Sequence, residues 1–583
     1  RADLPSVSIK DVYRHRTIRG LATALTDTGN DSGTDAGAGA TATPARPPAP
    51  TPPEPVPPAG TLKYTLCGVL QFLLFLGYSF LTAIITARGY TWISAGSNVT
   101  DIYLRSVAFG GAGFIGMCTF PIAAKWILIG RWKEREFPVW GLTYLRFWTV
   151  KALLHANPMV FLVGNPLYVL YLRALGARIG PGVTILSRTV PVCTDLLTIG
   201  AHTVIRKDSY FLCYRAYAGR IQTGPVTLGH NVFIGEKTVL DIATSMGDGA
   251  QLGHTSSLHS GQAVPGGQQW HGSPAQRTEL DYVRVPPARC GTWRRAGFGL
   301  ATVGQLFLFT VPLAVGGLYM LLTEVPALSD RLAPGTAGPV SAELYTDALI
   351  VSCGLFFSLV GVGLLVLFTV PRLLNLLVEP DRVYPLYGFH YSTHRAIARL
   401  TNVKFFTWLF GDSSYIVPYL RGLGYGLSRV EQTGSNFGTE VQHETPYLCS
   451  VGSGTMVADG LSIVNADFSS TSFRVSRASI GRHNFLGNNI VYPSGAKTGD
   501  NCLLATKVMV PLEGEVREGV GLLGSPCFEI PRSVERDLRF DHLRTGAELH
   551  RSLAAKNRCN IRSMVLFLLV RWFFFFVLTV LAL

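Results

Sequence analysis

Apolar residues recur at every sixth position in two stretches of the chain. They stand at Leu228, Ile234, Leu240, Met246, Leu252, Leu258 and Val264, and again, with polar Thr498 among them, at Ile480, Leu486, Tyr492, Thr498, Leu504, Val510, Val516 and Leu522. Neither a helix nor a plain strand has this period. A parallel β-helix does, because each flat face takes six residues and one of them points inward.

The two stretches align at a constant offset of 252 residues. Several glycines match across this offset, and Gly272-Ser273-Pro274 matches Gly524-Ser525-Pro526. We therefore expect one β-helix domain, duplicated over residues 173–290 and 421–535. Two insertions, Arg206–Arg220 and Ser469–Arg477, interrupt the coils at matching places, and we interpret them as loops on the substrate side.

Five apolar runs are long enough to cross about 30 Å of hydrocarbon as helices. They lie within residues 61–130 (two runs), 296–374 (two runs) and 563–583 (one run). The last run is expected to continue beyond Leu583. Between the runs lie a basic interfacial connector at 131–172 and connectors at 375–420 and 536–562. This order predicts transmembrane helices that alternate with the two β-helix domains.

Lysines and arginines flank the apolar runs on the side of the β-helices. They include Arg131, Lys133, Arg294, Arg295 and Arg372, whereas the loop at 323–346 is mainly acidic. By the positive-inside rule, we expect a multi-pass protein of the cell membrane with cytoplasmic β-helices and outer loops at 88–106 and 323–346. The net charge of +14 suits anionic membrane lipids. No nucleic-acid-binding motif is present in the sequence.

Ten cysteines stand singly, without a C-x-x-C pair or a Cys/His cluster at zinc spacing. Reduced thiols are the simplest interpretation, and no metal is predicted.

The first 60 residues have a composition of their own. Residues 4–22, from Leu4-Pro5 through Thr17-Ile18-Arg19 to Ala22, resemble the closing helices of a peptidyl carrier domain from a non-ribosomal peptide synthetase. On this resemblance, residues 1–27 are a carrier tail, and the serine that carries phosphopantetheine lies upstream of Arg1. Residues 28–60 are a Gly/Ala-rich and then Pro-rich tract, which predicts an extended linker.

The turn Gly272-Ser273-Pro274-Ala275 resembles the exit of hexapeptide-repeat acyltransferases, which have left-handed β-helices and bind a thioester donor between coils. Together with the carrier-like tail and the apolar runs, it makes the chain similar to the C-terminal membrane region of the ε-poly-L-lysine synthetase family. The resemblance implies upstream adenylation and carrier domains as partners, a carrier-borne phosphopantetheine arm, a lysine-like amino-acid substrate and homo-oligomers. The family pattern has a sixth span and a third soluble domain, which this chain lacks.

The reaction that the resemblance implies is attack of an amine on an aminoacyl thioester. A lysine amine has a pKa of about 10.4, so the site must supply a base or desolvate the amine. Our candidate bases are His254, His259 and His443; a polar surface role is the simpler alternative for each. His254 and His259 stand on successive faces of late coils, and we expect the carboxylates that flank His443 to raise its pKa.

A cationic substrate also calls for carboxylates near the base. The candidates are Asp241 and Asp248 in the first domain and Glu444, Asp459 and Asp467 in the second. A solvated turn position is the simpler alternative for each of them. The candidate histidines are not shared between the two copies, since Thr506 stands at the position of His254. Two other functions stay open: a membrane acyltransferase that uses acyl-CoA, and a non-catalytic scaffold or export module.

Overall fold

The fold is that of a computed structural model of the chain. It describes residues 19, 22–23, 60–314, 316–317, 342–428, 437–530 and 546–582. The predicted carrier tail and nearly all of the linker, and most of the loop at 323–346, lie outside the described residues.

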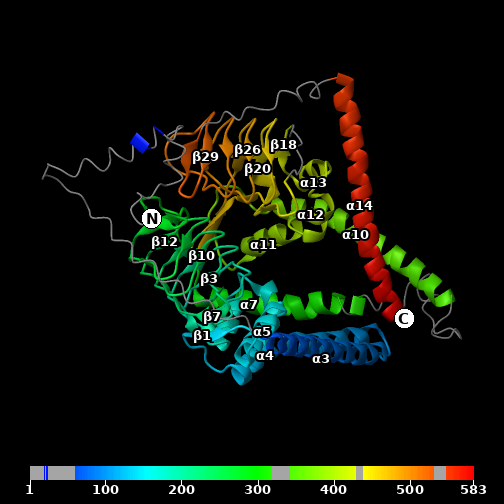
Figure 1. Cartoon of the computed structure of the whole chain (residues 1–583). Coiled ribbons are helices and arrows are strands. Elements are labelled where there is room, and N and C mark those ends of the chain that lie inside the picture. The colour runs from blue at the N-terminus through cyan, green and yellow to red at the C-terminus, as the bar shows by residue number, and fades with distance from the viewer. Residues whose placement is uncertain are drawn as a thin grey trace.

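Short parallel strands wind through residues 178–278 as the first β-helix (Figure 1). They are β2 (Arg178–Ile179), β3 (Thr184–Ile185), β4 (Leu197–Ile199), β5 (Val204–Ile205), β8 (Val226–Leu228), β9 (Phe233–Ile234), β10 (Val239–Leu240), β11 (Thr244–Met246), β12 (Gln251–Leu252), β13 (Ser257–Leu258), β14 (Ala263–Val264) and β15 (Gln269–Gly272), closed by antiparallel β16 (Ala275–Thr278). Phe233 pairs with Gln251, and Gln251 pairs with Gln269, so one coil takes 18 residues. Three faces of six residues account for this length, and every predicted inward residue is at most 3% exposed.

The second β-helix repeats this design from residue 426 to residue 530. Its strands are β18 (Gly426–Leu427), β19 (Gln442–His443), β20 (Cys449–Val451), β21 (Met456–Val457), β22 (Ser462–Val464), β25 (Ala478–Ile480), β26 (Phe485–Leu486), β27 (Val491–Pro493), β28 (Leu503–Leu504), β29 (Gly521–Leu523) and β30 (Phe528–Ile530). Phe485 and Leu503 are again 18 residues apart. One predicted inward residue is wrong: Val516 is 55% exposed, because the loop before β29 leaves the regular coil.

Each β-helix carries one inserted hairpin in the same coil. Strands β6 (Tyr214–Tyr217) and β7 (Arg220–Thr223) lengthen the first coil to 29 residues, from Val204 to Phe233. Strands β23 (Ala466–Phe468) and β24 (Ser472–Val475) do the same between Met456 and Phe485. Each hairpin pairs with a strand of its preceding connector, β1 (Arg135–Pro138) or β17 (Tyr384–Pro385).

Short helices in each connector cover the start of the following β-helix. The first set is α5 (Leu142–His155), η1 (Pro158–Leu162) and α6 (Pro166–Ala174); the second is α11 (Phe389–Thr401), α12 (Lys404–Phe410) and α13 (Ile416–Leu423). Tyr168 and Leu172 of α6 are buried in the core of the first β-helix, and Leu420 of α13 is buried in that of the second. The connectors therefore close the open ends of the β-helices.

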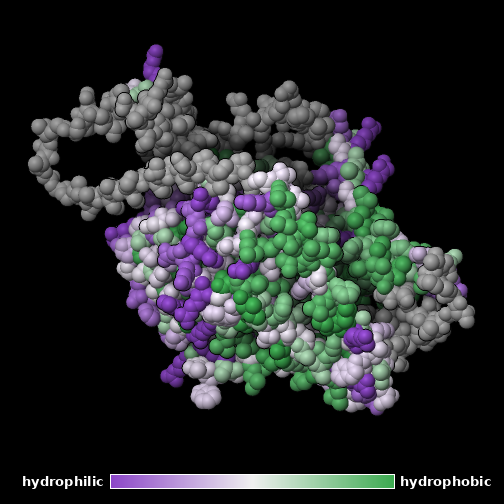
Figure 2. Space-filling view, turned by 60° about the horizontal axis from the view of Figure 1, so that its bottom comes forward, coloured by the Kyte–Doolittle hydropathy of each residue, from purple (hydrophilic) through white to green (hydrophobic). Residues whose placement is uncertain are grey.

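Five helices are long and apolar enough to cross a membrane. They are α3 (Thr61–Ser94), α4 (Val99–Leu128), α7 (Thr292–Gln305) with its continuation to Ala314, α10 (Ala342–Asn375) and α14 (Gly546–Ala582). Figure 1 shows them extending to one side of the β-helices, and Figure 2 shows apolar side chains gathered over one part of the surface. Two predicted boundaries are wrong: only residues 95–98 separate α3 from α4, and α14 begins inside the predicted connector 536–562.

A buried ion pair joins α4 to the first β-helix. The Nζ atom of Lys125 lies 2.7 Å from Oδ2 of Asp195, and the lysine side chain is fully buried. The same carboxylate accepts a hydrogen bond from the backbone N–H of Trp132. The membrane-type helix and the β-helix are thus fixed to each other by charge as well as by packing.

Candidate active site between the two β-helices

The two β-helices pack against each other over an apolar cluster to which both contribute. Phe233 and Tyr282 of the first domain lie in this cluster with Phe468 and Leu512 of the second. The two exit turns also meet: the Ser273 N–H donates to the Ser525 carbonyl at 2.8 Å. Gly272 has a φ of +100°, and a Cβ there would lie 2.5 Å from Cδ of Pro526, so this contact requires glycine.

A histidine and a carboxylate face each other on adjacent coils of the first β-helix. Glu236 follows β9 and His254 follows β12, 18 residues later, so one stands directly over the other. Nδ1 of His254 lies 2.5 Å from Oε2 of Glu236 and 3.1 Å from its backbone nitrogen. With a proton on Nδ1, His254 donates to the carboxylate, and Nε2 is left with a lone pair for a reacting proton.

Arg206 completes this arrangement on the other side of the carboxylate. It forms an ion pair with Oε1 of Glu236, and both side chains are almost fully buried. Burial of the carboxyl opposes ionisation, but Arg206 and His254 outweigh it and hold the pKa of Glu236 below its usual range. Glu236 is therefore an ionised carboxylate next to the imidazole.

The second domain holds Arg206 in place. Its guanidinium donates to the carbonyl of Ala466 at 2.7 Å and lies 4.3 Å from the ring centre of Phe468. Both residues belong to β23 of the inserted hairpin. The predicted substrate-side insertion of the second domain thus supports charged groups of the first.

His254 lines a small cavity at the contact of the two domains. The first domain contributes Thr255 and Tyr282, and the second contributes mainly apolar side chains, among them Met509 and Leu512. The cavity measures about 10 Å³, close to the space of one water molecule. Tyr282 also hydrogen-bonds through its hydroxyl to Nδ1 of His271 at 2.8 Å. A histidine held by a carboxylate therefore borders a largely apolar wall from another domain.

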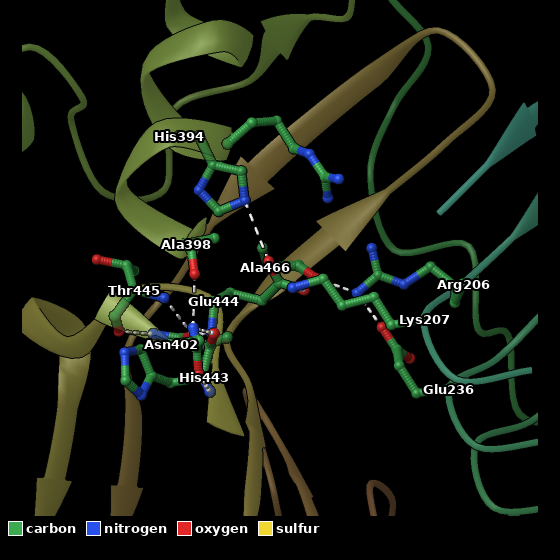
Figure 3. Close-up of polar contacts among 12 residues, drawn as sticks. Arg206, Lys207, Glu236, His394, Ala398, Asn402, His443, Glu444, Thr445 and Ala466 are labelled. Carbon is green, nitrogen blue, oxygen red and sulfur yellow. Dashed lines mark hydrogen bonds and ion pairs between the residues drawn. The ribbon is translucent and has the colours of Figure 1, made fainter. Parts of the chain in front are cut away.

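A second buried ion-pair chain crosses the same boundary (Figure 3). Lys207 Nζ lies 2.7 Å from Oε1 of Glu444, and Nε2 of His394 on α11 lies 3.3 Å from its Oε2. Burial would raise the pKa of Glu444, but Lys207 and His394 hold it well below its usual range. Lys207 comes from the first β-helix and Glu444 from the second, so this pair ties the domains together.

The surroundings of His443 correct our expectation for it. Burial and the charge of Lys207 lower its pKa to about 3, although Glu444 opposes this shift. Its Nδ1 lies 2.9 Å from the hydroxyl of Tyr425, and Asn402 hydrogen-bonds to its backbone. The expected rise in pKa is therefore wrong, because desolvation exceeds the effect of the flanking carboxylates. This environment disfavours His443 as a proton acceptor near neutral pH.

The other predicted site residues lie on turns and hairpins. His259 is exposed on a turn, where its backbone N–H donates to Gln262. Asp241 pairs with Arg215 at 3.2 Å, Asp248 accepts from the backbone N–H of His230, Asp467 lies 3.5 Å from Arg474, and Oδ1 of Asp459 is buried without a hydrogen bond to any described residue. Their roles in binding a substrate stay predictions. The structure brings His254, His443 and Glu444 to the domain boundary.

The sequence analysis missed Arg206, Lys207, Glu236 and His394. For Glu236 a signal was present, since its distance from His254 is one 18-residue coil. Arg206, Lys207 and His394 gave none, because their partners stand in another coil or another domain.

No family model matches the chain. A Delta-poly-L-ornithine synthetase of Acinetobacter baumannii (strain AB307-0294) is 24% identical over 516 residues, which cover 84% of this chain and 37% of that protein. The chain thus spans well under half the length of this relative.

Two solved structures with the hexapeptide-type fold also match. A hexapeptide-repeat acetyltransferase of Vibrio cholerae is 13% identical, with a TM-score of 0.18, over 29% of this chain and 92% of that one. A maltose O-acetyltransferase of Clostridium difficile is 13% identical, with a TM-score of 0.18, over 21% and 81%. At these scores they carry no argument about function. The chain is similar to a poly-amino-acid synthetase, it contains hexapeptide-repeat domains, and its long helices are compatible with a membrane protein.

Proposed function

We propose that the chain is a membrane-anchored module that forms amide bonds between amino acids, with His254 as the general base. The observation that carries the proposal is the contact between His254 and the ionised carboxylate of Glu236 at the domain boundary. The similarity to a poly-ornithine synthetase supports amino-acid oligomer synthesis with a cationic, lysine-like substrate. The donor is an aminoacyl thioester on the phosphopantetheine arm of a carrier domain.

The proposed step is aminolysis of this thioester. Nε2 of His254 takes a proton from the attacking amine as the new C–N bond forms. Glu236 stabilises the imidazolium that results. The tetrahedral intermediate then collapses, the C–S bond breaks, and the departing thiolate receives the proton from His254. An amine with a pKa of about 10.4 must first lose its extra proton, and the apolar wall of the second domain favours the neutral form.

The two copies differ in a way that supports divided roles. At the offset of 252, His254 corresponds to Thr506, Glu236 to Asn488 and Arg206 to Ala458. The second β-helix therefore lacks the histidine, the carboxylate and the arginine together. We assign the base to the first domain and the wall and support to the second.

We further propose that the β-helices lie on the cytoplasmic side, because lysines and arginines flank the long helices there. A cysteine at Ser97, between α3 and α4, would then react with a membrane-impermeant maleimide from outside intact cells. A cysteine at Lys497, in the second β-helix, would react only after the cells are opened. The reverse pattern would invert the topology. Removing the exposed Cys353 and Cys559 first keeps the background low.

The test of the reaction uses the chain in detergent micelles with lysyl- and ornithyl-4′-phosphopantetheine thioesters. Mass spectrometry is expected to show products spaced by one amino-acid residue. His254→Ala should abolish them, whereas His202→Ala, at an exposed turn of an earlier coil, should not. Loss in His259→Ala but not in His254→Ala would move the base to the exposed turn. Acetylation of an added amine from acetyl-CoA, without any oligomer, would favour the acyltransferase alternative.

A further inference from the structure

A second pocket opens where α11 and α12 meet both β-helices. Five cationic side chains line it, with one carboxylate among them: Arg188, Lys207, Arg395, Arg399, Lys404 and Asp208. The cavity measures about 80 Å³, enough for several water molecules and therefore for a small anionic group. Arg188 and Arg399 are exposed at its rim, whereas Arg395 is buried.

The positive charge of this pocket is only partly neutralised by the protein. Glu444 pairs with Lys207, and Glu440 pairs with Lys404 at 2.6 Å. Among the residues that the structure describes, no salt bridge joins Arg188, Arg395 or Arg399 to a carboxylate. Arg395 and Arg399 instead donate to the carbonyls of Val163 and Phe161. Partial burial lowers the pKa of Lys207, and Arg395 adds to this effect although Glu444 opposes it.

A buried polar atom on the wall also lacks a partner. His443 lines the pocket and is 4% exposed, and its Nε2 has no hydrogen bond to the described residues. Leaving such a nitrogen unpaired costs about 1–3 kcal/mol, which a ligand or a bound water would recover. The wall is thus built for a polar guest, at a point where the surrounding charge is positive.

These features select the chemistry of the ligand. A cationic amino acid is repelled by five positive charges, so the pocket is not the place of the attacking amine. An anion is attracted, and the planar fork of a guanidinium matches the oxygens of a phosphate group in a two-point contact. Three arginines without carboxylate partners therefore favour a phosphate over a single carboxylate.

We propose that this pocket binds a phosphate ester, held by Arg188, Arg395 and Arg399. The inference goes beyond the proposed function and does not require His254 to be the base. Two sources share this chemistry. One is the phosphodiester of a phosphopantetheine arm. The other is a lipid headgroup, because the carbonyls bound by Arg395 and Arg399 belong to the segment of η1, where Phe161 is 69% exposed.

Matched probe pairs separate the two sources. Binding to the whole chain in a maltoside detergent is measured by isothermal titration calorimetry, without turnover. The first pair is 4′-phosphopantetheine and pantetheine, which lacks the phosphate. The second is dihexanoyl-phosphatidylglycerol and dihexanoylglycerol. We expect one phosphorylated probe to bind and its unphosphorylated match not to bind; the pair that responds identifies the source. Added salt should weaken the binding.

Variants test the residues. Arg188→Gln and Arg399→Gln should each raise the Kd about tenfold, the effect of losing one charge-assisted hydrogen bond. Arg399→Lys should recover part of the affinity, and Arg277→Gln, at an exposed position on β16, should leave it unchanged. All of these side chains are exposed, so thermal unfolding should show folded protein throughout. Equal binding of matched probes, no binding of either phosphorylated probe, or an unaltered Kd in both glutamine variants would overturn the proposal.

Discussion

Nδ1 of His254 lies 2.5 Å from Oε2 of Glu236 because the two residues stand 18 positions apart in a β-helix with 18-residue coils. The coil places the carboxylate below the imidazole without any special loop. Arg206 keeps this carboxylate ionised from the other side. One repeat length thus creates a histidine whose orientation and charge are both controlled by its neighbour.

Replacement of Glu236 by glutamine should lower the rate of amide formation by about 10²–10⁴-fold. The amide keeps the shape of the side chain but removes the negative charge that stabilises the imidazolium. The rate of product formation from lysyl-4′-phosphopantetheine measures this effect. Asp500→Asn is the matched control, since Asp500 accepts a backbone N–H one coil away in the second domain. Full activity in Glu236→Gln would remove the carboxylate from the mechanism.

The ion pair of Arg206 and Glu236 should be more important to break than to have. Arg206→Met leaves a buried carboxylate with His254 alone, and Glu236→Gln leaves a buried guanidinium. Each single change should cost about 3–5 kcal/mol of unfolding free energy. The double variant should lose clearly less than the sum, because no uncompensated charge remains. Denaturant unfolding in detergent measures the cycle, and strict additivity would mean that the two charges do not interact.

The sequence alone predicts most of the fold because its repeats are local. The inward residues from Leu228 to Val264 are buried as expected, and the hairpins lie where the insertions interrupt the rhythm. A six-residue period is fixed by neighbouring coils, so it survives in the sequence. The exposed Val516 shows the limit, since the period continues there while the coil does not.

The site is less predictable because its contacts are long-range. Glu444 pairs with Lys207, 237 positions earlier, and Arg206 binds a carbonyl in the other domain. No periodicity connects such residues. The pKa of His443 was misjudged for a related reason: adjacent carboxylates are visible in the sequence, but burial is not.

Acidification should weaken the domain boundary between pH 6.5 and pH 5. The pKa of His443 is about 3 when folded and about 6.5 when unfolded. Below pH 6.5 the unfolded chain therefore binds a proton that the folded chain does not. The unfolding free energy should fall by about 2 kcal/mol by pH 5 from this group. His394, whose pKa burial also lowers, acts in the same direction.

The variant His443→Gln should flatten this pH dependence, since glutamine does not titrate. Lys207 and Glu444, the charged groups that face His443, keep their charges over this range, because the pKa of Glu444 lies well below it. Thermal unfolding at pH 7 and pH 5 gives the comparison. An equal loss of stability in both proteins would assign the effect to other groups.

Removal of the Asp195 carboxylate should loosen α4 from the first β-helix. Asp195→Asn leaves Lys125 fully buried without its counter-charge, at a cost of about 3–5 kcal/mol. Limited proteolysis of the connector between residues 129 and 141 should become faster. The double variant Lys125→Met with Asp195→Leu should recover much of the protection, because apolar side chains of similar volume often replace a buried ion pair. If Asp195→Asn is as resistant as the parent chain, packing alone holds the helix.

A bulky side chain from the second domain should block a site whose base lies in the first. Met509 borders the cavity of His254 from across the boundary and is 7% exposed. Met509→Trp fills a space of about one water, so amide formation should stop, while overpacking costs about 1–3 kcal/mol of stability. Met509→Leu keeps the volume and should retain activity. The two variants therefore separate steric blocking from a general loss of fold, provided that binding of 4′-phosphopantetheine at the basic pocket is unchanged in both. An active Met509→Trp protein would show that the reaction does not take place between the two β-helices.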